Sequence, residues 1–134
     1  MDDYFEVGAM IVSRLSEQIT DVSVYHLWRQ HEINEATDPI PSLKVELEAD
    51  VPGDVANNGK THKVEQRWVV ILVAKDDTVG PLVSRVIRAL SGWRPPGTLA
   101  PLKRVASSHT PDWSPAGVFY FPVAFSTGFV FTVE

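Results

Sequence analysis

One segment constrains the fold of this chain more than any other. Residues 63–75 begin with alternating polar and apolar side chains and become wholly apolar from Trp68 to Ala74. Alternation is typical of a strand with one face in water, whereas a continuous apolar run is typical of a strand covered on both faces. We therefore predict a strand here and place it at the centre of a sheet.

An amphipathic helix is predicted directly after this strand. Apolar residues recur with helical spacing at Val79, Leu82, Val83, Val86, Ile87 and Leu90. Residues 76–78 supply candidate N-caps, Pro81 suits the first helical turn, and Gly92 suits the position after the helix. The helix should therefore end just before Gly92, with Arg85 and Arg88 on its polar side.

A second helix is predicted near the N-terminus. Asp3 and Glu6 have the spacing of a capping box, in which each side chain satisfies a free backbone N–H of the other residue. The apolar stripe of this helix would comprise Phe5, Gly8, Val12, Leu15 and Ile19. The helix should end near residues 20–21, and a short strand at residues 22–27 and a polar loop at residues 29–39 should follow.

Residues 42–50 alternate regularly, which predicts a half-buried strand. Its apolar side would comprise Leu43, Val45, Leu47 and Ala49, and its face in water would comprise Lys44, Glu46, Glu48 and Asp50. Residues 51–62 contain Pro-Gly and Asn-Asn-Gly but few side chains to bury. We therefore predict a flexible excursion there, between two paired strands.

The C-terminal third is rich in β-forming residues. We predict a strand at residues 102–107, a proline-rich turn at residues 109–116, and a β segment at residues 117–133 in which Pro122 and Gly128 favour an edge, a bulge or a bend. The order of the elements and the length of 134 residues predict a single α+β domain over residues 1–134. It should contain a largely antiparallel sheet of about five strands and two helices.

The residue types that carry catalysis do not form a recognisable constellation. The chain has no cysteine, which excludes thiolate catalysis and the Cys-rich zinc modules. The four histidines lie in different predicted elements, and residues 31–35 lack the second histidine of a His-Glu-x-x-His zinc motif. Ser107, His109 and Asp112 are the residue types of a hydrolase triad but lack the Gly-x-Ser-x-Gly elbow, which favours a simple turn. We predict no enzyme activity, metal or cofactor.

Membranes and nucleic acids are poor candidate partners. No apolar run approaches the about 18 residues of a transmembrane helix, and the N-terminus lacks the basic flank of a signal peptide, so we expect a soluble, unexported protein. The net charge of −5 opposes binding to a phosphate backbone. The one basic set that could bind nucleic acid, ranked below a protein partner, comprises Arg85, Arg88, Arg94, Lys103 and Arg104, with Trp93 among them.

Charge is segregated along the chain. Residues 1–77 contain fifteen acids and seven bases, a net charge of −8, and residues 78–134 contain two acids and five bases, a net charge of +3. This asymmetry favours a protein partner, including another copy of the chain. The predicted subunit interface brings a basic set with an apolar anchor against acids of a neighbouring copy: Arg85, Arg88, Arg94 and Trp93 against Glu46, Glu48 and Asp50.

Three segments resemble phage tail terminator or tail-completion proteins. They are the apolar strand at residues 68–74, the helix with its Gly-Trp loop at residues 80–96, and the aromatic strand at residues 117–127. The resemblance implies a small α+β subunit that forms a hexameric ring on the end of the tail tube, stops tube growth and offers a surface to the head or neck. It also implies a phage or prophage protein of the virion tail, assembled in the bacterial cytoplasm, without catalytic residues.

Two alternatives stay open at this point. One is a head–tail joining or neck protein, which belongs to the same structural class. The other is a small enzyme or ligand-binding domain whose site is assembled from dispersed residues. A ring-forming protein should show oligomers in solution, whereas an enzyme of this size need not form them.

Overall fold

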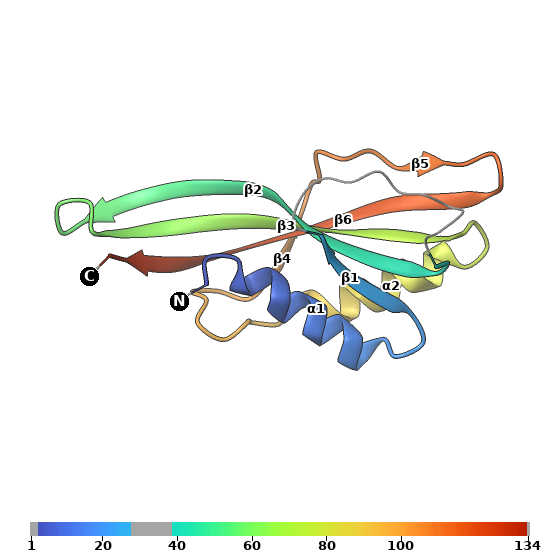
Figure 1. Cartoon of the computed structure of the whole chain (residues 1–134), viewed down its shortest axis with the longest axis horizontal. Helices are drawn as coiled ribbons and strands as arrows, with labels where there is room; N and C mark the ends of the chain where they lie inside the picture. The colour runs from blue at the N-terminus through green and yellow to red at the C-terminus, as the bar shows by residue number, and fades with distance from the viewer. Residues whose placement is uncertain (1–2, 28–38, 134) are drawn as a thin grey trace.

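The computed structural model describes residues 3–27 and 39–133 of the chain (Figure 1). The polar loop expected at residues 29–39 and the His-Glu segment at residues 31–35 therefore lie almost wholly outside the described part. The described elements, in chain order, are α1 (Glu6–Gln18), β1 (Ser23–Leu27), β2 (Ser42–Ala56), β3 (Thr61–Lys75), α2 (Val79–Leu90), β4 (Lys103–Val105), β5 (Asp112–Trp113) and β6 (Val118–Thr132).

The strands form one mixed sheet in the order β1-β2-β3-β6-β4, and β5 also pairs with β6. β1 runs parallel to β2, and the other pairs are antiparallel. The predicted α+β class is confirmed, and so is the central position of β3. The structure has six strands within its described residues instead of about five, because Asp112 and Trp113 pair with β6 where we expected only a turn.

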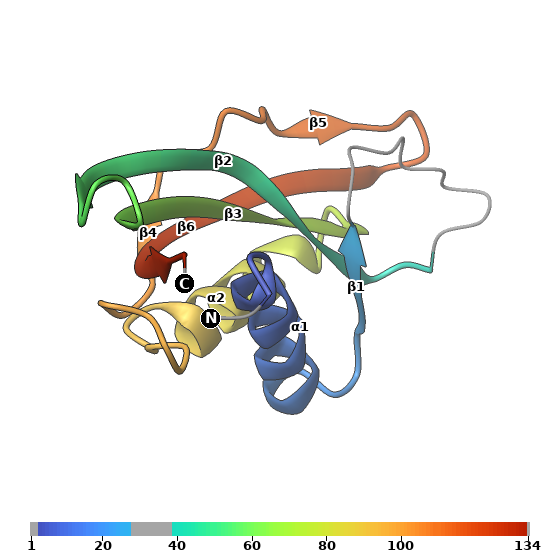
Figure 2. The ribbon, with the colours of Figure 1, turned by 60° about the vertical axis from the view of Figure 1, so that its left-hand side comes forward.

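Both helices cover the same face of the sheet (Figure 2). The core between the helices and the sheet is apolar, and its largest fully buried side chains include Trp68, Phe125, Phe129, Ile11, Leu15 and Leu72. The bounds of α2 match the predicted helix closely, and Gly92 has a positive φ of 81°, as a residue after a helix commonly does. The helix face and the end signal of α2 could therefore both be predicted from its own residues.

α1 is rotated relative to the prediction. Its buried residues are Val7, Gly8, Ile11 and Leu15, whereas Phe5 is exposed and Val12 is half-buried. Gly8, Leu15 and Ile19 of the predicted stripe are buried as expected, and a Cβ at Gly8 would lie 2.4 Å from the buried Trp68 ring. The predicted capping box is also wrong, because the N-cap residue is Phe5 and not Asp3. The Asp3 carboxylate accepts a hydrogen bond from the N–H of Phe5 at 2.9 Å, and Phe5 precedes the helix.

The expected excursion at residues 51–62 is instead a regular part of the sheet. β2 and β3 continue as a hairpin to Ala56 and Thr61, and the pairing is interrupted by a register shift between Pro52 and Val55. The turn contains Asn57 and Asn58 with φ of 53° and 58°, a conformation that asparagine tolerates well. The prediction that residues 51–62 leave the sheet was therefore wrong. The few buried side chains there led to it, but two strands can pair through their backbones without burying side chains.

β6 accompanies this hairpin along its whole length. It pairs with β3 from Lys75↔Val118 to Thr61↔Thr132 without a register shift. We call the distal part of these three strands the arm, namely residues 50–56, 61–66 and 127–132, together with the turn at residues 57–60. Figure 1 shows the arm extending away from the helices at one end of the long axis.

β6 is an edge strand only in places, which corrects the expectation for residues 117–133. On the side away from β3, it pairs with β5 at residues 119–120 and with β4 at residues 124–126. Pro122 lies between these two short ladders, so its missing N–H costs neither of them a hydrogen bond. The proline signal was correct locally, whereas residues 119–120 and 124–126 have strand partners on both sides.

Candidate assembly surface

The basic residues predicted to bind a neighbouring copy have different local roles. Arg85 makes a bidentate ion pair with Asp21, with N–O distances of 2.5 and 3.2 Å. This hydrogen-bonded pair lowers the pKa of the Asp21 carboxyl below its ordinary value. Arg88 and Arg94 are exposed, and Arg94 donates a hydrogen bond to the Thr98 carbonyl at 3.2 Å.

Trp93, the predicted apolar anchor, is half-buried against the core of its own subunit. The Arg14 guanidinium lies 5.2 Å from the centre of the Trp93 ring, a cation–π arrangement. Arg14 also donates to the Ala89 carbonyl at 3.0 Å, which ties α1 to the end of α2. Much of the Trp93 ring therefore already serves the packing of α1 on α2.

The acids of the predicted interface are mostly hidden, which corrects the face expected to be in water. Lys44 and Glu46 are only 2% and 6% exposed, and the Glu48 side chain is 1% exposed. Asp50 alone of the three acids is exposed, and it accepts hydrogen bonds from Tyr4 and Gln66, both at 3.2 Å. Glu46 and Glu48 cannot face a neighbouring copy in this conformation.

A segment far along the chain covers these acids. Ser107, Ser108 and His109 all hydrogen-bond Glu48 on β2. They belong to the segment that links β4 to β5, and both of these strands pair with β6. Because β3 lies between β2 and β6, this segment must cross the sheet on the face opposite the helices (Figure 2). We call residues 106–111 the strap.

Glu48 is the point where the strap is fastened. Its carboxylate accepts hydrogen bonds from Ser107 Oγ at 2.7 Å, the Ser108 N–H at 2.6 Å and Arg67 Nε at 2.9 Å, and it lies 3.2 Å from His109 Nδ1. Burial alone would raise the pKa of Glu48, but the hydrogen bonds from the strap outweigh burial and lower the pKa to about 2. The strap is therefore held by a carboxylate that stays ionised.

Ser107 and His109 do come together with a carboxylate, but not as a catalytic triad. The two ring nitrogens of His109 face Glu48 at 3.2 Å and Glu46 at 3.0 Å. The Ser107 hydroxyl donates to Glu48, so the histidine is not positioned to take its proton. No group of metal-binding side chains is found among residues 3–27 and 39–133. The geometry is that of a structural fastening.

The arm carries features that the sequence analysis missed. It exposes apolar side chains on its two outer strands, with Val51 and Val55 at 54% and 66% on β2 and Val130 at 38% on β6. The alternation of β2 could have been followed past Asp50, but the Pro-Gly pair obscured it. Leu99, in the loop before β4, is also 54% exposed.

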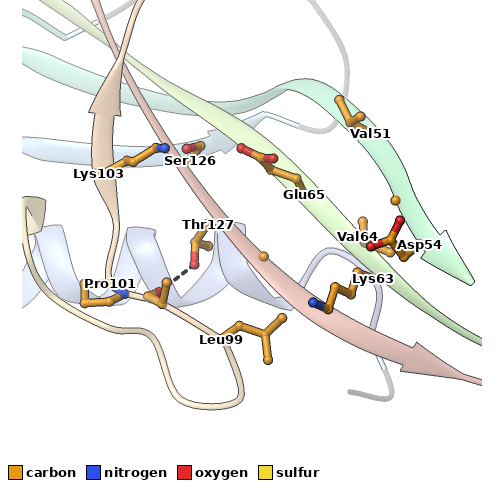
Figure 3. Close-up of a pocket in the computed structure, with 13 residues that line it drawn as sticks. Val51, Asp54, Lys63, Val64, Glu65, Leu99, Pro101, Lys103, Ser126 and Thr127 are labelled. Atoms are coloured by element: carbon orange, nitrogen blue, oxygen red, sulfur yellow. Dashed lines mark hydrogen bonds between the residues drawn. The ribbon is translucent and has the colours of Figure 1, made fainter.

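A shallow groove of about 400 Å³ crosses the sheet at the base of the arm. Figure 3 shows Val51 and Asp54 on the β2 side of the groove and Leu99 and Lys103 on the other side, with β3 and β6 between them. Its lining contains acids and bases on neighbouring strands, with Asp54 on β2, Lys63 and Glu65 on β3, and Lys103 on β4. This arrangement is typical of a surface that meets another protein rather than of an enclosed ligand site.

The fold and these surfaces define a small α+β protein whose open, oppositely charged edges lie on the two sides of one sheet within the described residues. No helix in the described part of the chain is long and apolar enough to cross a membrane. The chain matches the family described as phage tail terminator protein over residues 1–133, and it belongs to that family. A comparison with curated proteins finds no match. The chain thus has a structural role in a phage tail, as the resemblance implied.

Proposed function

We propose that this chain caps the tail tube as a homo-oligomeric ring, stops the growth of the tube and presents the surface to which the head or neck attaches. Membership of the terminator family over residues 1–133 carries the proposal. A ring of six copies follows from the same resemblance. In this role the tail tube protein and the head or neck proteins are its partners, and the virion tail is its location.

The charge distribution supports a ring. A closed ring uses a heterologous contact, in which one patch of a subunit meets a different patch of the next copy. The exposed acids Asp50 and Asp54 lie on β2, whereas the exposed bases Lys103 and Arg104 lie on β4 at the far edge of the sheet. Two unlike patches on opposite edges suit such a contact.

Removal of the gene from the phage or prophage that encodes it tests the proposal. If the protein stops tube growth, its loss should produce tails of uncontrolled length that carry no heads, and expression of the wild-type chain should restore both properties. Tail lengths and attached heads are counted by electron microscopy. Headless tails of normal, uniform length would contradict termination and favour the alternative, a head–tail joining protein.

The ring itself is tested with the purified chain. Mass photometry or sedimentation over a range of concentrations should show an oligomer with a defined number of copies. A protein that stays monomeric at the highest concentration, and also in the presence of tail tubes, would contradict the ring.

A further inference from the structure

The two outer edges of the sheet differ in charge. Residues 47–56 of β2 contain three acids and no base, and the exposed acids there are Asp50 and Asp54. Residues 94–105, which include β4, contain three bases and no acid, namely Arg94, Lys103 and Arg104, all of them exposed. Opposite charges on the two edges favour contact between unlike edges and oppose contact between like edges.

In the part of the chain that the structure describes, both edges also offer unpaired backbone. β1 pairs with β2 only from Ser42 to Glu46, so within the described residues β2 has no outer partner strand from Leu47 to Ala56. On the other side, β4 covers β6 at residues 124–126, and the Leu99 N–H donates to the Gly128 carbonyl at 2.7 Å. Residues 129–132 of β6 then have no outer strand among the residues described. Such open edges are templates for strand addition.

Exposed apolar side chains lie where these edges would meet. Val51 and Val55 project from β2, and Leu99 and Val130 lie on the other side. Single exposed apolar residues are ordinary, but here they accompany both open edges. The register shift between Pro52 and Val55 shortens the stretch of β2 that can add regularly, which restricts the register of the contact.

We propose that the acidic edge of the arm in one copy docks on the basic edge of the next copy, so that β2 adds as a strand beside residues 129–132 of β6 and residues 98–104 flank it. The proposal rests on the proposed function, because it names the contact that builds the ring. In this contact, Asp54 and the exposed Val51 and Val55 take the place of the predicted acids Glu46 and Glu48, which are buried. The two edges lie on opposite sides of β3 and β6, so one copy can use both of them at once.

Charge exchange between the edges tests this contact. The first variant, Asp54→Lys with Val55→Lys, makes the arm edge basic, and the second, Lys103→Glu with Arg104→Glu, makes the other edge acidic. All four positions are exposed, so both variants should keep the unfolding midpoint of the parent. Each variant alone should associate at least about tenfold more weakly than the parent, because like charges then face each other. Asp76→Lys with Asp77→Lys, a similar charge change on exposed residues outside both edges, is the matched control.

The decisive measurement is a mixture of the two variants. Both edges of the first variant are basic, and both edges of the second variant are acidic. In a heterologous contact between the two variants, every basic edge therefore faces an acidic edge. An equimolar mixture should therefore recover oligomers, and the chain that carries all four changes should assemble as well.

The outcomes separate this proposal from the proposed function. If the parent forms rings and the variants assemble as the parent does, or if the mixture fails to recover oligomers, the edge contact is wrong and the ring survives. If the parent forms no oligomer under any condition, the ring itself is wrong. Recovery in the mixture of the two edge variants, while each variant alone stays dissociated and the control assembles as the parent does, supports the contact between unlike edges.

Discussion

A buried carboxylate is tolerated only when its oxygens have partners, and Glu48 has them from two segments distant in sequence. Replacement of Glu48 with glutamine puts an amide among the Arg67, Ser107 and Ser108 donors, so at least one donor loses its acceptor. We expect the free energy of unfolding at neutral pH to fall by about 1–3 kcal/mol. Urea denaturation measures this change, and Asp76→Asn, at an exposed acid, should change stability by less than about 0.5 kcal/mol.

The same variant predicts a pH dependence. The folded state lowers the pKa of Glu48 from 4.5 to about 2. Its ionised form therefore contributes stability that is fully present above pH 4.5 and is lost as the pH falls toward 2. The parent should lose more stability than Glu48→Gln across this window, so that the two curves converge. Parallel curves would show that Glu48 does not titrate as the structure implies.

Gly8 and Gly80 are helical glycines with opposite expected responses to alanine. A Cβ at Gly8 would lie 2.4 Å from the buried Trp68, whereas a Cβ at Gly80 would meet nothing within 4 Å. Gly8→Ala should therefore destabilise the fold by about 1–3 kcal/mol, and Gly80→Ala should stabilise it by about 0.5–1 kcal/mol through helix propensity. Thermal or urea unfolding measures both changes. A stable Gly8→Ala variant would mean that Trp68 does not pack on α1 as described.

At the scale of elements, residues 51–60, the tip of the arm, combine backbone pairing with little burial. Every residue from Val51 to Lys60 is exposed, whereas residues 68–70 and 72–74 of β3 are buried. We expect the amides of residues 51–60 in the isolated subunit to exchange at least about a hundredfold faster than those of residues 69–73, because local opening there breaks few apolar contacts. Hydrogen exchange followed by mass spectrometry measures this difference. Equally slow exchange in both parts would contradict the predicted flexibility.

The elements that could be predicted from sequence are those whose signal lies within their own residues. β3 and α2 were placed correctly by their apolar patterns, and Gly92 by its position after the helix. The period of β2 was also correct, but the expected water on the face with Glu46 and Glu48 was not. That face is covered by the strap, which follows Glu48 by about sixty residues, and no local pattern reports a contact of that range.

The candidate site was predictable to a similar extent. Segregated charge pointed to a partner, and Asp50 and Arg94 are exposed as the interface hypothesis required. The open edges of the arm could not be foreseen, because an edge exists only once the register of the neighbouring strands is known. Here that register leaves β1 ending opposite Glu46, so that most of β2 has no outer partner among the described residues.

At the scale of the whole molecule, two basic surfaces compete as the contact with a neighbouring copy: the α2 face with Arg85 and Arg88, and the β4 edge with Lys103 and Arg104. Arg85 is already paired with Asp21, and two of the three acids expected to meet the α2 face are buried. Arg85→Glu with Arg88→Glu should therefore weaken self-association less than Lys103→Glu with Arg104→Glu. In the latter variant, salt should strengthen association where it weakens that of the parent, because screening then acts on like charges that face each other.

Sedimentation of both variants at low and high salt decides between the two surfaces. The Arg85 change also breaks an exposed ion pair, which is worth about 0–1 kcal/mol, so its effect on folding must be measured alongside. If the α2 variant dissociates and the β4 variant assembles as the parent does, the ring contact runs across the helix layer and the edges of the sheet face water. If the β4 variant alone dissociates, the ring closes through the sheet, and the helices stay free to face the head or the tube.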